Sequence, residues 1–138
     1  AGIRVICYFI DDIYNLVNAL KRQSELIFIR EKDYIQNPKP NGYRSFHVII
    51  AVPVYYLDTM EYFPVEIQLR TMTMDLWASM EHRVCYKKLP EHRDELAEAF
   101  CQYADILGKI EEQFEAYNET GMLEEITPAQ ITENPTEG

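Results

Sequence analysis

The chain has 138 residues, 47% of them hydrophobic, and a formal net charge of −10 at pH 7. One core is expected, because domains typically contain about 100 to 200 residues. The negative charge argues against a protein that binds nucleic acid by neutralising phosphates over a broad surface. The sequence shows no signal peptide and no apolar run of about 18 residues, so we expect a soluble protein without a membrane anchor.

The charge is unevenly distributed along the chain. Residues 91–138 contain 13 acidic and two basic residues, whereas residues 1–90 contain 10 acidic and 11 basic residues. The first two-thirds could therefore hold a polyanion such as a nucleotide. The three cysteines, Cys7, Cys85 and Cys101, have neither metal-ligand spacing nor the pattern of a disulfide framework. This usage favours a reducing cytoplasm.

The first third of the chain predicts a strand, a helix and a second strand. Segment 2–8 is rich in β-branched and aromatic residues and predicts a mostly buried strand. Because this strand starts the chain without a methionine, we expect a fragment of a longer protein. A helix is predicted from Asp11 or Asp12, as N-cap, to about Ser24. Its expected apolar face consists of Ile13, Leu16, Val17 and Leu20.

The middle of the chain predicts a hairpin followed by a helix. A second strand at about 26–31 leads into the segment 37–42, whose Asn, Pro and Gly residues exclude regular structure. Two strands at about 44–55 and 62–70 are expected to pair as an antiparallel hairpin. A helix is then expected from Met72 to Lys87, with Thr71 or Thr73 near its cap and Pro90 marking a break. Its predicted apolar stripe consists of Leu76, Trp77, Met80 and Val84.

Apolar residues recur at spacings of four and three in the last third of the chain, which is typical of a long helix packed on another helix. They are Leu96, Phe100, Tyr103, Leu107, Ile110, Phe114 and Tyr117. This seam could dock onto a second copy of the chain or onto the chain's own sheet. We predict one domain over residues 1–118, including this helix at about 91–118, and a flexible acidic tail over residues 119–138.

Polar side chains alternate with apolar ones on the two strands that are expected to pair. Residues of one parity on an extended strand point to the same face. The polar sets are Glu66, Gln68 and Arg70 on the second strand, and Tyr43, Ser45 and His47 at the start of the first. The two sets could meet on one surface. The alternative is an edge strand with a solvated face, which has the same alternation.

These residue types suit a nucleotide site. Lys39 and Arg44 could contact phosphates, and the Tyr43 ring could stack on a base. Gly42 would let the backbone approach the ligand closely. A carboxylate beside phosphates, here Glu66, suggests a Mg²⁺ ligand. Taken singly, each residue has a simpler explanation as a solvated loop charge, a surface ring or a strand-face acid.

Three segments in order resemble the synthetase domain of RelA/SpoT-type alarmone synthetases. They are PKPNGYRSFH (38–47), VEIQLRT (65–71) and MDLWASMEHRVCYKK (74–88), and the opening AGIRVICYFIDDIY is most similar to the small, single-domain members. The resemblance implies an α/β (α+β) fold of the nucleotidyltransferase type, with a mixed, largely antiparallel sheet flanked by helices. The apolar spacing of residues 96–117 predicts a long C-terminal helix in addition. It also implies transfer of the β,γ-pyrophosphate of ATP to the 3′-hydroxyl of GTP or GDP, which makes pppGpp or ppGpp in the bacterial stringent response.

The resemblance also assigns roles to residues. Tyr43 matches a tyrosine that stacks on guanine, and Arg4 matches an arginine that packs against the adenine of ATP. Glu66 matches the acid that helps to bind Mg²⁺ and to activate the 3′-hydroxyl. Lys39, Asn41 and His47 match residues that hold the acceptor nucleotide. With Arg44, the phosphate candidate, and with the other polar positions of the strand, the residues expected around the acceptor are Lys39, Asn41, Tyr43, Arg44, His47, Gln68 and Arg70. In the family, a metal-binding aspartate and an ATP-binding arginine-and-lysine motif precede the position of Ala1, so the fragment alone would lack part of the ATP pocket.

Two other readings are open, and one expectation concerns assembly. A catalytically inactive module that senses guanosine nucleotides is the main alternative, although Glu66 beside Arg70 favours an enzyme. An RNA-binding regulator is disfavoured by the net charge, although a local basic patch could serve it. Small members of the family often form tetramers, so the resemblance implies a homo-oligomer, with the seam 96–117 as its candidate surface.

Overall fold

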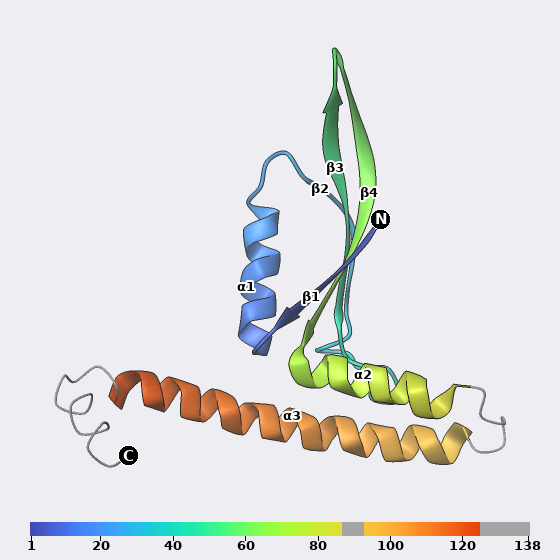
Figure 1. Cartoon of the computed structure of the whole chain (residues 1–138), viewed down its shortest axis with the longest axis vertical. Helices are drawn as coiled ribbons and strands as arrows, with labels where there is room; N and C mark the ends of the chain where they lie inside the picture. Colours follow the sequence, from blue (N-terminus) through green and yellow to red (C-terminus); the bar gives the residue numbers. More distant parts are fainter. Residues whose placement is uncertain (87–92, 125–138) are drawn as a thin grey trace, which may run out of the picture.

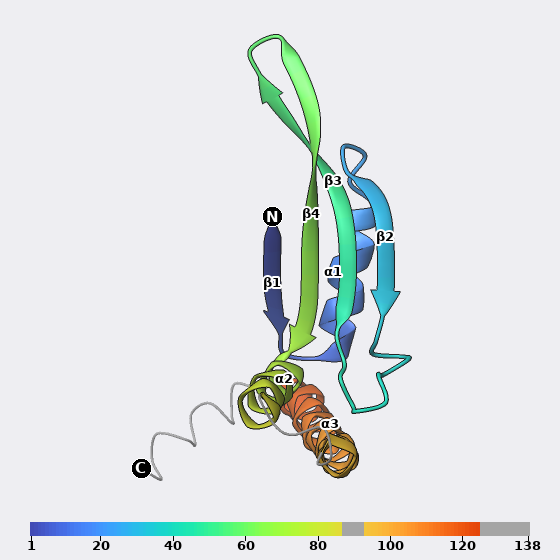
Figure 2. The same ribbon diagram turned by 90° about the vertical axis from the view of Figure 1, so that its right-hand side faces the viewer.

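The computed structural model describes residues 1–86 and 93–124. Four strands form one sheet in the order β1-β4-β3-β2. The strands are β1 (Gly2–Cys7), β2 (Ile27–Asp33), β3 (Phe46–Tyr56) and β4 (Thr59–Thr71), and the helices in this part of the chain are α1 (Ile10–Lys21), α2 (Met72–Cys85) and α3 (Arg93–Glu124). Helix α1 runs along one face of the sheet, whereas α2 and α3 lie side by side across its end (Figures 1 and 2).

The sheet is mixed and largely antiparallel, as predicted. Strand β1 pairs in parallel with β4, and β3 pairs antiparallel with both β4 and β2. The β3–β4 hairpin turns at Leu57, whose φ is 54°, and its strands are paired from Phe46 opposite Leu69 to Tyr56 opposite Thr59. The hairpin extends beyond β1 and β2 as a two-stranded arm (Figure 2).

Helix α1 buries the apolar face that its spacing predicts. Ile13 and Val17 are buried against the sheet, and Leu16 and Leu20 pack partly buried beside them. Each fully buried side chain of this size stabilises the fold by about 1.5 to 3 kcal/mol. The sheet residues beneath the helix are Val48, Ile50, Ile67 and Leu69.

The predicted N-cap of this helix at Asp11 or Asp12 is wrong. The helix begins at Ile10, with Phe9 as the cap residue. Asp12 lies one turn inside, where its carboxylate accepts a hydrogen bond from the Phe9 backbone N–H at 3.1 Å. Both aspartates still stabilise the helix, because negative charge in the first turn interacts favourably with the helix dipole.

Strand β1 lies at an edge of the sheet and is not mostly buried, contrary to the prediction. Val5 and Cys7 pack against the core, but Ile3 and Ile6 are 52% and 43% exposed. Within the described residues only β4 pairs with β1. A run of β-branched residues favours a strand without specifying its place in the sheet, so the sequence could not distinguish the two positions.

Helix α2 begins at Met72, and Thr71 is its N-cap, as predicted: the Thr71 hydroxyl accepts the Met74 N–H at 3.3 Å. Its covered face differs from the predicted stripe: Met74 and Trp77 are buried, whereas Leu76, Met80 and Val84 are exposed. The reason is that, within the described residues, the sheet end and α3 cover α2 on the side of Met74 and Trp77. The predicted continuation to Lys87 and the break at Pro90 lie outside the described residues.

Only part of the predicted apolar seam of α3 is packed against another element of the described chain, and the rest is exposed. Phe100 and Ala104 are buried and, with Leu96 and Leu107, belong to the cluster around Trp77 of α2. The remaining seam residues, Tyr103, Ile110, Phe114 and Tyr117, are exposed. The helix continues to Glu124, past the predicted end at 118, and residues 125–138 of the predicted tail lie outside the described part. Among the described helices, none is both long and apolar enough to cross a bilayer.

Candidate functional site

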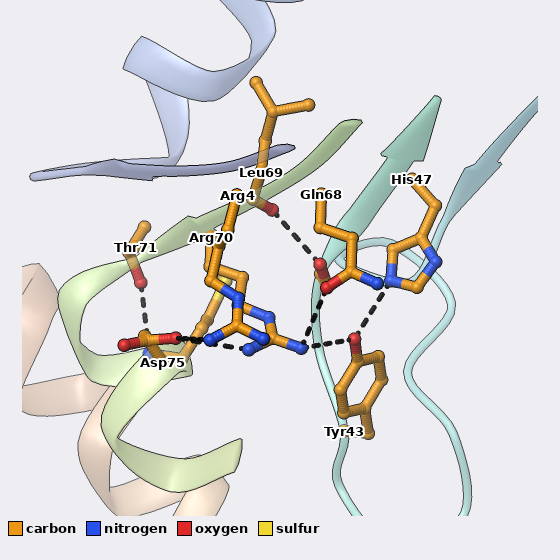
Figure 3. Close-up of polar contacts among 10 residues, drawn as sticks. Arg4, Tyr43, His47, Gln68, Leu69, Arg70, Thr71 and Asp75 are labelled. Atoms are coloured by element: carbon orange, nitrogen blue, oxygen red, sulfur yellow. Dashed lines mark hydrogen bonds and ion pairs between the residues drawn. The ribbon is translucent and has the colours of Figure 1, made fainter. Parts of the chain in front are cut away.

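A row of polar side chains lies on the face of the sheet opposite α1. Glu66, Gln68 and Arg70 of β4 alternate with the buried Ile67 and Leu69. Across the neighbouring strands, Gln68 is in register with Arg4 of β1 and with His47 of β3. The shared face that alternation predicts for His47, Gln68 and Arg70 is therefore confirmed (Figure 3).

Arg70 contacts three other side chains on this face, and its own side chain is 8% exposed. Its Nη2 donates to the Tyr43 hydroxyl at 2.9 Å and to Gln68 Oε1 at 3.3 Å (Figure 3). Its Nη1 donates to Asp75 Oδ1 at 3.1 Å. Within the described part of the chain, its buried Nε has no hydrogen-bond partner. A buried guanidinium held on two sides, with one donor unused, is a fixed positive charge suited to an anionic ligand.

Tyr43 and His47 form a second contact pair on the same face. The Tyr43 hydroxyl is hydrogen-bonded to His47 Nε2 at 2.9 Å. Burial lowers the pKa of His47, and Arg70 is the largest of the nearby positive charges that lower it further, whereas Glu66 opposes the shift. A neutral imidazole fits the geometry, because the hydroxyl accepts from Arg70 and has its own proton to donate to an unprotonated nitrogen.

Cations and rings surround Tyr43. Lys39 Nζ lies 5.0 Å from the Tyr43 ring centre and 4.9 Å from that of Tyr34. Arg70 Cζ lies 5.4 Å from the Tyr43 ring centre. The Tyr34 ring meets Tyr43 edge-on at 6.0 Å and His47 at 5.3 Å. This cluster combines an aromatic surface with positive charge, the combination that binds a base with attached phosphates.

The loop before β3 is shaped by its own backbone. The Asn41 side chain accepts the Tyr43 N–H at 3.1 Å, and the Gly42 N–H donates to the Lys39 carbonyl at 2.8 Å. Gly42 has a φ of 99°, which disfavours any residue with a Cβ. The sequence predicts that Gly42 lets the backbone approach a ligand. Instead, Gly42 lets it approach α3, because a Cβ on Gly42 would lie 2.9 Å from Cys101 Cα.

Two residues that the sequence places in the site, Arg44 and Ser45, do not lie on the open sheet face with the other polar side chains. Arg44 points to α3, where Nη2 lies 2.7 Å from Asp105 Oδ1 and Nη1 donates to the Ala104 carbonyl at 3.1 Å. Ser45 is fully buried and donates to the Leu69 carbonyl at 3.2 Å. Both precede the first residue of β3, so the alternation of an extended strand does not yet apply to them.

Glu66 and Arg4 occupy the more open end of the row. They line a shallow depression together with Gln68, whose amide donates to Glu66 Oε1 at 3.4 Å. Arg4 Nη1 is 3.6 Å from Asp75 Oδ1. The described residues contain no group of three or more His, Cys, Asp or Glu side chains that could hold a metal ion. Glu66 fits as one carboxylate ligand of a Mg²⁺ ion that is otherwise bound by phosphate oxygens and water.

Sequence reasoning missed two residues of the site. Asp75 interacts with both Arg4 and Arg70, and Tyr34 lies against both Tyr43 and His47. Asp75 lies in the first turn of α2, where an acid is already expected from the helix dipole. Its place in the first turn of a helix that directly follows the strand containing Arg70, five residues away, is the signal that could have identified it.

The geometry is accompanied by clear similarity to known proteins. A family model described as "Region found in RelA / SpoT proteins" matches residues 1–91. The chain is 48% identical over 113 residues to GTP pyrophosphokinase YwaC of Bacillus subtilis (strain 168), an alignment that covers 82% of this chain and 54% of that relative. The chain spans about half the length of the curated relatives it matches.

Solved structures of similar proteins share the fold. The crystal structure of small alarmone synthetase 2 from Bacillus subtilis matches with a TM-score of 0.76 and 44% identity, covering 86% of this chain and 65% of that one. Small alarmone synthetase 1 from Bacillus subtilis, bound to its product pppGpp, matches with a TM-score of 0.74 and 28% identity over 86% of this chain and 60% of that one. The predicted fold class and the family resemblance are confirmed.

Proposed function

Since the chain belongs to the RelA/SpoT family, we propose that it carries the acceptor half of a (p)ppGpp synthetase site. The reaction would transfer the β,γ-pyrophosphate of ATP to the 3′-hydroxyl of GTP or GDP. The observation that carries the proposal is the continuous polar row on the open sheet face, in which Glu66 is linked through Gln68 to Arg70 and Tyr43. In this proposal, the base site, the phosphate site and the carboxylate lie next to one another.

Tyr43 and its cationic neighbours would bind the guanosine nucleotide. The Tyr43 ring would stack on guanine, because a base can lie on an aromatic face without a specific hydrogen-bond pattern. Lys39 and Arg70 would contact its phosphates, and Arg70 is already fixed by Tyr43, so little ordering would be needed on binding. Asn41, His47 and Gln68 would complete the acceptor site. Arg44 is the exception, since its guanidinium is bound to α3.

Glu66 would act on the 3′-hydroxyl. As the 3′-oxygen attacks the β-phosphorus of ATP, the bond from that phosphorus to the α,β-bridging oxygen breaks and AMP leaves. The Glu66 carboxylate would accept the hydroxyl proton, a general-base role worth about 10²- to 10⁴-fold in rate. Mg²⁺, if bound by Glu66 and the phosphates, would supply charge neutralisation. Arg4, on the neighbouring strand, would pack against the adenine of ATP.

The experiment is pyrophosphate transfer from γ-labelled ATP to GTP and GDP by the full-length protein with Mg²⁺. Glu66→Gln should lose most of the transfer while still binding GDP, whereas Glu61→Gln, an exposed acid on the same strand, should transfer normally. Binding of GDP without transfer by the wild type would instead establish the sensing module. Binding of neither nucleotide would refute both readings.

Assembly and location are proposed on narrower grounds. The exposed apolar residues of α3, among them Ile110, Phe114 and Tyr117, support a homo-oligomer, and the family resemblance suggests a tetramer. The cytoplasmic location rests on the cysteine usage and stays a prediction. Sedimentation of the full-length protein beside a Phe114→Glu variant would test the oligomer, because a charge in a buried interface disfavours association.

A further inference from the structure

The loop before β3 is anchored to helix α3 on both sides of Tyr43. On one side, Gly42 approaches the helix so closely that a Cβ would lie 2.9 Å from Cys101 Cα. On the other side, Arg44 Nη2 donates to Asp105 Oδ1 at 2.7 Å. Tyr43 lies between these two anchors, so its backbone position depends on α3.

The Tyr43 ring is supported from the same direction. It meets the Trp77 ring edge-on with 6.2 Å between the ring centres. Trp77 Nε1 donates to the Phe100 carbonyl of α3 at 2.7 Å, and the Trp77 and Phe100 rings also pack edge-on at 6.0 Å. Trp77 is 4% exposed. The ring and the backbone of Tyr43 therefore both rest on groups that α3 fixes.

Gly108 provides room on α3 for the Arg44 guanidinium. A Cβ at this position would lie 2.9 Å from Arg44 Nη1. Glycine in the interior of a helix is less stable than alanine by roughly 1 kcal/mol, so Gly108 lowers the stability of α3. The atom that would clash is the end of a flexible side chain. An alanine would therefore displace the guanidinium and leave the helix intact.

We propose that Asp105 and Gly108 are positioning residues for the acceptor nucleotide. Acting through Arg44, they hold Tyr43 where guanine stacks on it. The proposal rests on the function proposed above, and it gives Arg44 a different role from the phosphate contact predicted from sequence. Both residues follow the segment 1–91 that the family model matches.

Steady-state transfer by the full-length protein tests the effect on the acceptor. Asp105→Asn should raise the KM for GDP about threefold, since the Asp105 carboxylate is largely exposed and such ion pairs are weak. Gly108→Ala should raise it by about fivefold or more, because the added Cβ meets Arg44 Nη1 and displaces a guanidinium that is bound to two acceptors on α3. The KM for ATP should stay within about twofold. Glu112→Gln, an exposed acid on the same helix, should have no effect.

A reciprocal exchange provides the conservative test. Arg44→Asp combined with Asp105→Arg restores the ion pair with its charges reversed, and should recover part of the GDP affinity that either single change loses. An unchanged KM for GDP in both Asp105→Asn and Gly108→Ala would overturn the proposal. An equal rise in the KM for ATP would overturn it as well.

The fluorescence of Trp77, the single tryptophan of the sequence, gives a measurement that needs no activity. Gly108→Ala and Asp105→Asn should shift its emission to the red and increase its quenching by acrylamide while the helical content measured by circular dichroism is retained, and Glu112→Gln should not. Unshifted emission in both variants would overturn the positioning role. If the shifts occur but the wild type neither binds GDP nor transfers pyrophosphate, the role of α3 in placing the loop stands and the proposed function fails.

Discussion

The Arg70 guanidinium donates to the Tyr43 hydroxyl at 2.9 Å while its central carbon lies 5.4 Å from the centre of the same ring. One tyrosine thus contributes a hydrogen bond and an aromatic face to the same cation. Because the hydroxyl is also bonded to His47, both of its hydrogen-bonding roles are used within the protein, so a contact of Tyr43 with a ligand would have to come from its ring.

The hydroxyl and the ring of Tyr43 should therefore contribute separately to binding. Tyr43→Phe keeps the ring and should raise the Kd for GDP by about threefold to tenfold, through the loss of one hydrogen bond that orders Arg70. Tyr43→Ala should raise it further, by about 5- to 150-fold, which corresponds to about 1 to 3 kcal/mol of stacking. Titration calorimetry with GDP measures both. Equal losses in the two variants would contradict the stacking role.

Asp75 should be important for stability because it is the carboxylate bound to the buried Arg70. Asp75→Ala leaves that guanidinium without its counter-charge, and we expect a loss of about 1 to 3 kcal/mol. The upper range for buried pairs does not apply, because the Asp75 side chain is 31% exposed. Urea unfolding beside Asp58→Ala, in the exposed hairpin turn, isolates the effect. Equal midpoints for the two variants would show that the pair contributes nothing.

Local rules were sufficient where the partner of a residue is close in sequence or set by strand pairing. Alternation placed Gln68 and Arg70 on one face, and hairpin pairing brought His47 opposite Gln68. The Thr71 cap follows from a hydroxyl residue placed just before a helix, and the apolar face of α1 follows from helical spacing. These features require only the geometry of a single element or of two adjacent ones.

Local rules failed where a distant element decides the orientation. Arg44 and Gly42 carry the signature of a ligand loop, but both contact a helix about 60 residues further along the chain. The exposed Leu76 of α2 is a similar case, since only the position of α3 determines which side of α2 is covered. The open part of the α3 seam, around Phe114, shows that a regular repeat does not identify its own partner.

His47 should make stability depend on pH below neutrality. Its pKa in the folded protein is lowered below the ordinary value of 6.5, chiefly by burial, so the unfolded chain takes up the proton first. The contribution of the neutral ring is fully present above about pH 6.5 and is lost as the pH falls toward the folded pKa. His47→Gln, which keeps an acceptor for Tyr43, should lose less stability than the wild type between about pH 7 and pH 5. Parallel stability curves would contradict the shift.

Tyr14 links α1 to the end of β2, outside the polar row. Its hydroxyl donates to Asp33 Oδ2 at 2.6 Å, and the other oxygen of Asp33 accepts the N–H groups of Ile35 and Gln36. Tyr14→Phe keeps the edge-on contact with Phe46 and leaves Asp33 two backbone donors. We therefore expect a modest loss of about 1 kcal/mol, less than for Asp33→Ala, which removes all three bonds.

The pH dependence of this loss provides its own control. Burial and the Asp33 carboxylate raise the pKa of Tyr14 above its ordinary value of 10.0. A raised folded pKa means that the advantage of tyrosine over phenylalanine is fully present below about pH 10 and is lost as the pH rises toward the folded value. Unfolding midpoints of wild type and Tyr14→Phe should therefore differ by a constant amount from about pH 7 to pH 9 and converge above pH 10. A difference that already shrinks between pH 7 and pH 9 would show that the hydroxyl is not held by Asp33.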